Sequence, residues 1–123
     1  GTGQLYLYRT TGPKFEIGRF NGTINKNTTA GTNRVNGTFY TVVATFDTTN
    51  GMALYVNGTV DGTDADTGTN ATSVSAAGIG GDVVNVNQFF DADIAEIGGY
   101  AQALSTANRN SLEAYLRTKY AHY

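Results

Sequence analysis

The chain has 123 residues and a hydrophobic fraction of 40%, which is enough for one folded domain with its own core. A net charge of −2 excludes the basic surface expected of a nucleic-acid-binding protein, and no stretch approaches the roughly 20 apolar residues of a membrane span. The absence of cysteine excludes disulfides and thiolate chemistry. Only 15% of the residues are charged, and Gly, Thr and Asn are abundant, so the composition predicts a mostly β protein.

The first elements expected along the chain are two short strands and a polar loop. Residues 4–8 have the character of a strand, and residues 15–20 form a second strand that Asn21 and Gly22 close. Residues 25–37 are polar and contain several Gly and Asn residues, which predicts a long loop.

The clearest pattern lies between residues 40 and 60. Residues 40–46 alternate between two faces, with Tyr40, Val42, Ala44 and Phe46 on one of them. Met52, Leu54 and Val56 alternate in the next strand and are expected to point inward. Asn57-Gly58 follows, and Asn-Gly between short strands predicts a type I′ hairpin. This stretch is therefore expected to form an antiparallel meander.

The rest of the chain changes character twice. Residues 61–81 carry few large apolar side chains and permit no strand assignment, whereas residues 83–86 and 89–97 are expected to be strands. A helix is predicted at about residues 106–120, with Ser105 as its N-cap. Its packing face is expected to consist of the side chains that recur at three- and four-residue spacing, Leu112, Tyr115, Leu116 and Tyr120. Glu113 and Arg117 have the spacing of a helical ion pair.

Two blocks of sequence carry a family resemblance. The first is FYTVVATFD at residues 39–47 with LYVNG at 54–58, and the second is FDADIAEI at 90–97, ALS at 103–105 and EAYLRTKY at 113–120. Their content and order resemble the laminin G-like domains of the concanavalin A-like lectin/glucanase superfamily.

The resemblance implies an all-β fold, an antiparallel concanavalin A-like (jelly-roll) β-sandwich with one C-terminal α-helix. Because domains of that family are usually longer, it also implies the C-terminal portion of such a domain. Residues 1–123 are therefore expected to form a single sandwich domain, either a smaller one or a fragment that lacks N-terminal strands.

Catalytic groups are sought among the acids and the single histidine. A glycosidase needs two carboxylates that face one bond, but Asp93 and Glu96 would point to opposite faces of a strand. Asp91 and Asp93 share a face without a third acid in phase. His122 lies at the penultimate position, where chain termini fray. We therefore expect the chain not to be an enzyme.

A short acidic segment resembles a calcium loop. Asp61, Asp64 and Asp66 are its candidate calcium ligands, since oxygen ligands at nearby positions suit Ca²⁺. Gly68 occupies a ligand position and no Glu closes the loop, so a solvated acidic loop is the favoured alternative. Calcium is the only cofactor that the sequence suggests.

Tyrosines are the candidate carbohydrate ligands, because a sugar ring offers an apolar face and a rim of hydroxyls. Tyr6, Tyr8, Tyr55 and Tyr100 are available, with burial in or against the sandwich as the alternative role. Tyr55 alternates out of phase with its inward-pointing neighbours, so it faces away from the core unless the helix covers it. Tyr55 and Tyr100 are the two carbohydrate-binding candidates.

The expected function is a non-catalytic carbohydrate-recognition or adhesion module of an extracellular or virion surface protein, with a polysaccharide or cell-surface glycan as partner. The alternative is a structural virion protein, such as a capsid-decorating, fibre or tail subunit, whose sandwich mediates assembly with other chains. A concave sheet lined by exposed aromatic and amide side chains would favour binding, whereas a flat apolar patch on the order of several hundred Å² would favour assembly.

Overall fold

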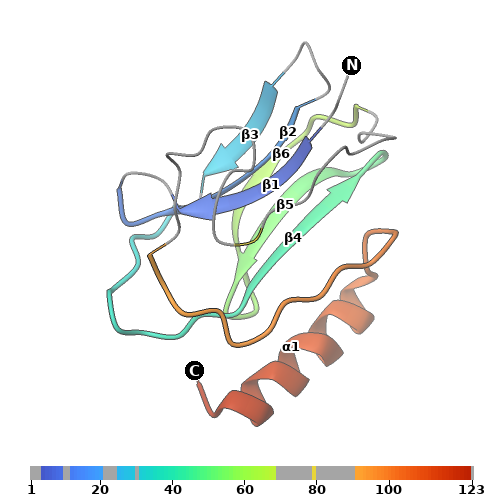
Figure 1. The fold of residues 1–123 in the computed structure, drawn as a ribbon. Helices are drawn as coiled ribbons and strands as arrows, with labels where there is room; N and C mark the ends of the chain where they lie inside the picture. Colours follow the sequence, from blue (N-terminus) through green and yellow to red (C-terminus); the bar gives the residue numbers. More distant parts are fainter. Residues whose placement is uncertain are drawn as a thin grey trace.

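The computed structural model describes residues 4–9, 12–20, 25–29, 31–68, 79 and 91–122. The first sheet has the order β1-β2-β3 and the second has the order β4-β5-β6, and both are antiparallel. The elements are β1 (Gln4–Arg9), β2 (Phe15–Phe20), β3 (Asn25–Thr29), β4 (Val42–Asp47), β5 (Gly51–Val56), β6 (Thr59–Asp64) and α1 (Thr106–Tyr120). The second sheet lies between the first sheet and α1 (Figure 1). The predicted sandwich with one C-terminal helix is confirmed.

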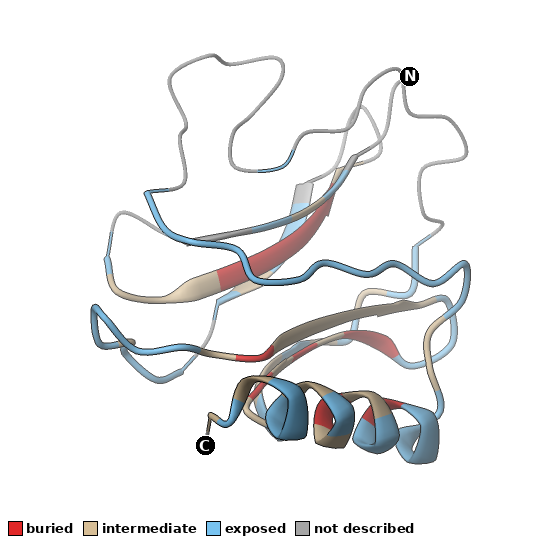
Figure 2. Cartoon of the chain, turned by 60° about the horizontal axis from the view of Figure 1, so that its bottom comes forward, coloured by how far each residue is buried: buried red, intermediate tan, exposed pale blue. Residues whose placement is uncertain are grey.

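The core lies between the two sheets. Ile17 from β2 and Met52, Leu54 and Val56 from β5 are buried there (Figure 2). Partly buried hydrophobic residues pack against them, namely Phe15, Tyr40, Val42, Ala44 and Phe46. Successive side chains of a strand point to opposite faces, so one face of each of these strands supplies the core. The inward-pointing residues predicted for residues 40–56 are confirmed.

The turn between β5 and β6 also follows the prediction. Asn57 and Gly58 have φ angles of 50° and 82°, as a type I′ turn requires. The Oδ1 atom of Asn57 accepts a 2.9 Å hydrogen bond from the backbone N–H of Thr41. The backbone N–H of Asn57 donates to the Thr41 carbonyl, also at 2.9 Å. The turn is thereby fixed to the residue that precedes β4.

Strands form in two segments where none was predicted, one expected to be a loop and one left without a strand assignment. Residues 25–29 were expected in a loop, but they form β3, paired with β2 along its length. The carboxylate of Glu16, a buried residue of β2, accepts hydrogen bonds from Asn27 Nδ2 at 2.8 Å and from Thr29 Oγ1 at 2.7 Å. Polar strand residues are stable here because a buried acceptor satisfies them. In the same way, β6 extends to Asp64, into the segment that allowed no strand assignment.

The strand expected at residues 89–97 is wrong for residues 91–97, which form no strand and are exposed. Ile94 and Ile97 are three positions apart, so an extended segment cannot present both to one sheet face. This segment instead contacts α1, where the Tyr120 hydroxyl approaches the Ala95 carbonyl at 3.4 Å. The strand predicted at 83–86 and residues 89–90 lie outside the described residues.

Helix α1 has the predicted ends. The Oγ atom of Ser105 accepts a hydrogen bond from the backbone N–H of Asn108 at 3.3 Å, which confirms the N-cap. After the helix, His122 is half-buried and its Nε2 atom lies 2.6 Å from Thr41 Oγ1. This contact places the C-terminal end of α1 near the start of β4 and counts against the fraying expected at His122. No helix in the described ranges has the length and apolarity to cross a membrane.

The packing face of α1 differs from the prediction. Its two buried residues are Arg109 and Glu113, whereas Tyr115 is 49% exposed and Leu112, Leu116 and Tyr120 are only partly buried. Glu113 forms an ion pair with Arg109 at 3.0 Å, whereas the predicted partner was Arg117. The cause lies on β5, where the guanidinium of Arg109 stacks on the ring of Tyr55, 3.8 Å from its centroid. This contact turns the helix toward its Arg109 side.

Candidate functional site

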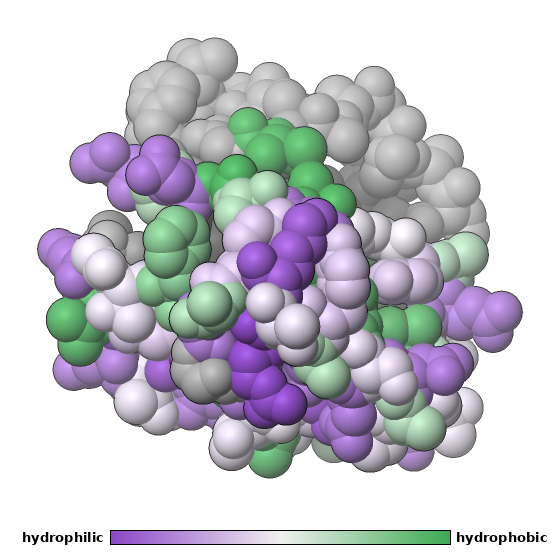
Figure 3. All heavy atoms as spheres, turned by 90° about the horizontal axis from the view of Figure 1, so that it is seen from below, coloured by the Kyte–Doolittle hydropathy of each residue, from purple (hydrophilic) through white to green (hydrophobic). Residues whose placement is uncertain are grey.

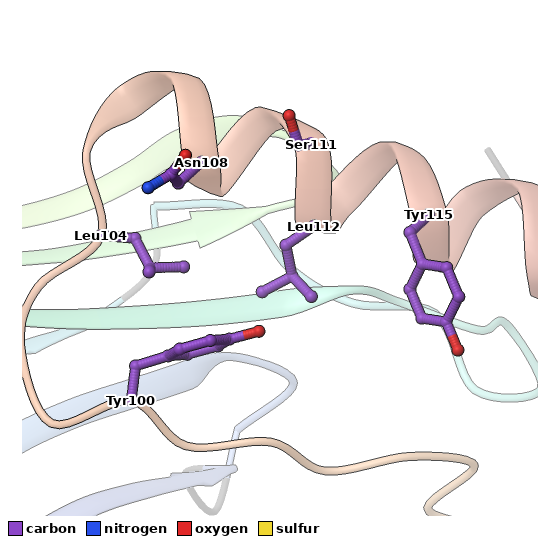
Figure 4. Close-up of a pocket in the computed structure, with 6 residues that line it drawn as sticks. All are labelled: Tyr100, Leu104, Asn108, Ser111, Leu112 and Tyr115. Atoms are coloured by element: carbon purple, nitrogen blue, oxygen red, sulfur yellow. The ribbon is translucent and has the colours of Figure 1, made fainter.

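A groove of about 360 Å³ lies between α1 and the segment that precedes it. We call it the α1 groove, and its lining residues are Tyr100, Leu104, Asn108, Ser111, Leu112 and Tyr115 (Figure 4). The preceding segment supplies the first two and the helix supplies the others. The volume is at the small end of the range typical of ligand pockets, about 300–1,000 Å³.

The α1 groove has an apolar floor with two exposed aromatic rings. Leu104 and Leu112 point toward the ring of Tyr100 (Figure 4). Tyr100 is 59% exposed and Tyr115 is 49% exposed, so both rings keep surface for a ligand. Asn108 adds an amide that both donates and accepts hydrogen bonds. The groove therefore combines apolar rings with hydrogen-bonding groups.

Beyond Tyr115, an exposed polar cluster joins the preceding segment to α1. The ammonium of Lys119 donates to Glu96 Oε2 at 2.8 Å and to the Tyr115 hydroxyl at 2.9 Å. The Tyr120 hydroxyl donates to the same Glu96 oxygen at 2.9 Å. The Lys119 ammonium also lies 5.3 Å from the ring centroids of Tyr115 and Tyr120. These contacts hold Tyr115, and with it one wall of the groove, in place.

The cluster shifts the pKa values of its members. Hydrogen bonds from Lys119 and Tyr120 stabilise the ionised form of Glu96 and lower the pKa of its carboxyl group. The hydrogen bond to Glu96, followed by that to Tyr115, raises the pKa of Lys119. The hydrogen bond to Glu96 also raises the pKa of Tyr120, since it favours the protonated phenol. At neutral pH Glu96 is therefore ionised and Lys119 is protonated.

This arrangement predicts an acid-sensitive contact. A lowered carboxyl pKa means that the contact is complete above the ordinary Glu value of about 4.3 and is lost as pH falls through the lowered value. We expect the NMR signals of the Tyr115 and Tyr120 rings to shift together, with a midpoint below about pH 4.3. Glu96→Gln should abolish this transition. A midpoint at or above the ordinary value would contradict the geometry.

The other carbohydrate candidate, Tyr55, lies outside the α1 groove. It is on the outer face of β5 and half-buried, and Arg109 covers one face of its ring. The alternation of residues 52–56 left open whether the helix covers Tyr55, and Arg109 of α1 does cover it. Tyr6 in β1 lies over Gly18, since a Cβ atom at Gly18 would overlap its ring. Tyr8 is in β1, and its side chain lies outside the described residues.

The three candidate calcium ligands point to different partners. Asp61 forms an ion pair with Arg34, and Asp66 accepts a 3.2 Å hydrogen bond from Arg19 Nε. Asp64 Oδ1 accepts the backbone N–H of Asp66 at 2.7 Å. Within the ranges that the structure describes, which include all three, no group of three His, Cys, Asp or Glu side chains converges to hold a metal ion. Calcium binding at these residues stays a prediction that would require a rearrangement.

That prediction is tested by calorimetric melting with calcium and with a chelator. We expect the same melting temperature in both, because calcium would have to displace two arginines from Asp61 and Asp66. A higher melting temperature with calcium, reversed by the chelator and absent from Asp64→Ala, would instead establish the calcium loop.

The acids considered for catalysis lie on the surface. Asp91, Asp93 and Glu96 are exposed, and Glu96 is held by Lys119. None of them lines the α1 groove.

Sequence reasoning found Tyr100 in the groove but missed its neighbours. Leu112 and Tyr115 were assigned to helix packing, although with Asn108 and Ser111 they follow the three- and four-residue spacing of one helix face. That spacing was the available signal. It could not say whether this face meets the sheet or a groove.

Comparison with known proteins gives one family. A family model, Laminin_G_3, described as the concanavalin A-like lectin/glucanases superfamily, matches residues 1–108. The match includes all six strands and Tyr100, Leu104 and Asn108 of the α1 groove. No curated protein and no solved structure matches the chain.

Proposed function

The chain belongs to the concanavalin A-like lectin/glucanase superfamily, and from this premise we propose that it is a non-catalytic carbohydrate-recognition module. Its ligand is a polysaccharide or a cell-surface glycan, which it binds in the α1 groove. A β-sandwich of this superfamily fits carbohydrate binding or adhesion in general. Such a role belongs outside the cell, on a cell surface or on a virion.

The observation that carries the proposal is the pair of exposed tyrosine rings in the groove. Tyr100 and Tyr115 are both about half exposed, and the groove brings them together from two segments of the chain. An aromatic ring offers a flat apolar surface that matches the apolar face of a pyranose. Asn108 lies in the same groove and can exchange hydrogen bonds with the hydroxyl rim. The Ser111 hydroxyl instead donates to the Ala107 carbonyl at 3.0 Å and points away from Tyr100 (Figure 4).

The chemistry of the groove supports binding without catalysis. Glycoside hydrolysis needs two carboxyl groups about 5–5.5 Å or 6.5–9.5 Å apart, of which one is protonated. The six lining residues include no carboxylate. The nearest acid in the cluster, Glu96, has a lowered pKa, which makes it a poor proton donor.

The proposal predicts that Tyr100→Ala weakens glycan binding at least about tenfold, as expected for a central aromatic contact. Tyr100→Phe, which keeps the ring, should retain most of the affinity. The test begins with affinity electrophoresis of the chain in gels that contain β-glucan, xylan, galactomannan or chondroitin sulfate. Titration calorimetry with an oligosaccharide of any retarding polymer then gives the affinity.

Phe39→Ala is the matched control, since Phe39 is 57% exposed but does not line the groove. It should bind like the unmodified chain. Equal losses in Tyr100→Ala and Phe39→Ala would place recognition elsewhere. Failure of all polymers to retard the chain would count against carbohydrate binding.

A second function, assembly as a structural virion subunit, is favoured by the exposed apolar residues. Leu5 and Leu7 of β1 pair with Arg19 and Ile17, so they are on the core side of the first sheet, yet they are 45% and 46% exposed. The surface seen from the α1 side is largely hydrophilic, and its main apolar group lies in the upper part of the view (Figure 3). Exposed apolar surface of this kind suits protein contacts.

Light scattering coupled to size exclusion distinguishes the two functions. A monomer near 13.0 kDa is the result expected for a self-sufficient recognition module. A defined oligomer, broken by Leu7→Asp, would move assembly to first place.

A further inference from the structure

A second pocket, which we call the hairpin pocket, lies where the β5–β6 turn meets α1. It has a volume of about 310 Å³, and its lining residues are Asn57, Gly58, Thr59, Asn110, Glu113, Ala114 and Arg117. The helix residues that line it differ from those of the α1 groove. With 3.6 residues per turn, positions 110, 113 and 117 point away from positions 108, 111 and 115. The two pockets therefore flank α1 on opposite sides.

The chemistry of the hairpin pocket centres on the buried carboxylate of Glu113. Its side chain is only 6% exposed, and both of its oxygens accept from the same Arg109 nitrogen, at 3.1 and 3.0 Å. In the described part of the chain this nitrogen is its only hydrogen-bond donor. Two carboxylate oxygens offer about four acceptor positions, so acceptor capacity remains.

The carboxylate is also held rigidly. Arg109 is fixed between Glu113 and the ring of Tyr55, whose centroid lies 3.8 Å from the Cζ atom of Arg109. A Cβ atom at Gly58 would lie 3.5 Å from Glu113 Oε2, so the carboxylate borders the turn. A hydrogen bond to an ionised, fixed acceptor is stronger than one between neutral groups.

The rest of the lining consists of three neutral polar side chains, two small residues and the guanidinium of Arg117. Asn57, Thr59 and Asn110 supply amides and a hydroxyl, and the pocket contains no aromatic ring. These groups match a ligand that carries several hydroxyls, which donate to the carboxylate and exchange hydrogen bonds with the amides. A hydrophobic ligand would find little apolar surface here.

We propose that the hairpin pocket is a second carbohydrate subsite, which binds a sugar residue by hydrogen bonds from its hydroxyls to Glu113 and to the neighbouring amides. The proposal rests on the carbohydrate-binding function, and it assigns the two pockets different parts in it. The α1 groove stacks a ring face, whereas the hairpin pocket holds a hydroxyl rim.

The test uses the full chain and the oligosaccharide identified by affinity electrophoresis. Asn110→Ala should weaken its binding at the hairpin pocket about three- to tenfold, the effect of losing one hydrogen bond. Glu113→Gln, which keeps the shape but removes the charge, should weaken it further. A thermal melt of each variant shows whether it is folded, and Asn110→Ala remains informative if Glu113→Gln is not, since Asn110 is exposed.

NMR titration locates the subsite directly. We expect the side-chain amide signals of Asn57 and Asn110 to shift on addition of the oligosaccharide, and Asn110→Ala to reduce the neighbouring Asn57 shift. Shifts limited to the α1 groove, with normal affinity in Asn110→Ala, would overturn the second subsite and leave the proposed function intact. If an oligosaccharide that binds the chain shifts no signal in either pocket, both the second subsite and the proposed function are overturned.

Discussion

Arg109→Ala should lower the free energy of unfolding by about 3–5 kcal/mol, because it leaves the buried carboxylate of Glu113 without its partner. The side chains of Arg109 and Glu113 are 9% and 6% exposed, so water can replace only a small part of the lost contact, from the side of the hairpin pocket. The substitution also removes the cation over the ring of Tyr55, the contact that orients α1 on the second sheet. Urea unfolding followed by circular dichroism measures the change.

Two control variants separate the ion pair from other effects. Arg109→Met with Glu113→Leu removes both charges and keeps side-chain volume, so it should recover most of the stability. Thr118→Ala changes an exposed position of the same helix and should alter stability by no more than about 0.5 kcal/mol. A loss below about 1 kcal/mol for Arg109→Ala would show that the pair is not a buried anchor.

Gly51→Ala is the second substitution with a large expected effect. Gly51 has a φ of 85°, a conformation that costs other residues about 1–2 kcal/mol. A Cβ atom there would also overlap the backbone carbonyl of Asp64 and lie 3.0 Å from the Cα atom of Ala65. Because backbone atoms cannot turn aside as a side chain does, we expect a total loss of about 2–5 kcal/mol in urea unfolding.

Gly37→Ala is the matched control for this experiment. Gly37 also has a positive φ, of 77°, but a Cβ atom there meets nothing within 4 Å. Gly37→Ala should lower the free energy of unfolding only by the cost of a positive φ in alanine, about 1–2 kcal/mol. Equal losses at the two glycines would show that β6 does not pass beside Gly51 as the structure places it.

The parts of the fold that local sequence determines were predictable. Residues 42–56 alternate with apolar side chains on one face, and Asn57-Gly58 is one of the residue pairs that favour a tight hairpin. The ends of α1 follow from Ser105 and from the helical spacing that begins after it.

The parts that depend on distant partners were missed. β3 has no apolar alternation, and its side chains are held by Glu16, which lies 11 residues from Asn27 and 13 from Thr29. Likewise, Asp66 looked like a metal ligand because its partner, Arg19, lies 47 residues away. Local pattern carries no information about such partners.

The site was predictable in part for the same reason. Tyr100 was identified by residue type, but the α1 groove exists because α1 turns its Arg109 side to the sheet and leaves Leu112 and Tyr115 at the flank. Periodicity shows which helix residues share a face. It does not show whether that face meets a sheet, a neighbouring segment or a ligand.

Chemical-shift mapping of a bound oligosaccharide on the ¹⁵N-labelled chain tests the central claim most directly. If the α1 groove is the primary carbohydrate site, the largest shifts will lie at Tyr100, Leu104 and residues 108–115, and Tyr100→Ala will abolish them. Binding with its largest shifts on the first sheet, at residues 15–20 or 25–29, would contradict the assignment of the groove.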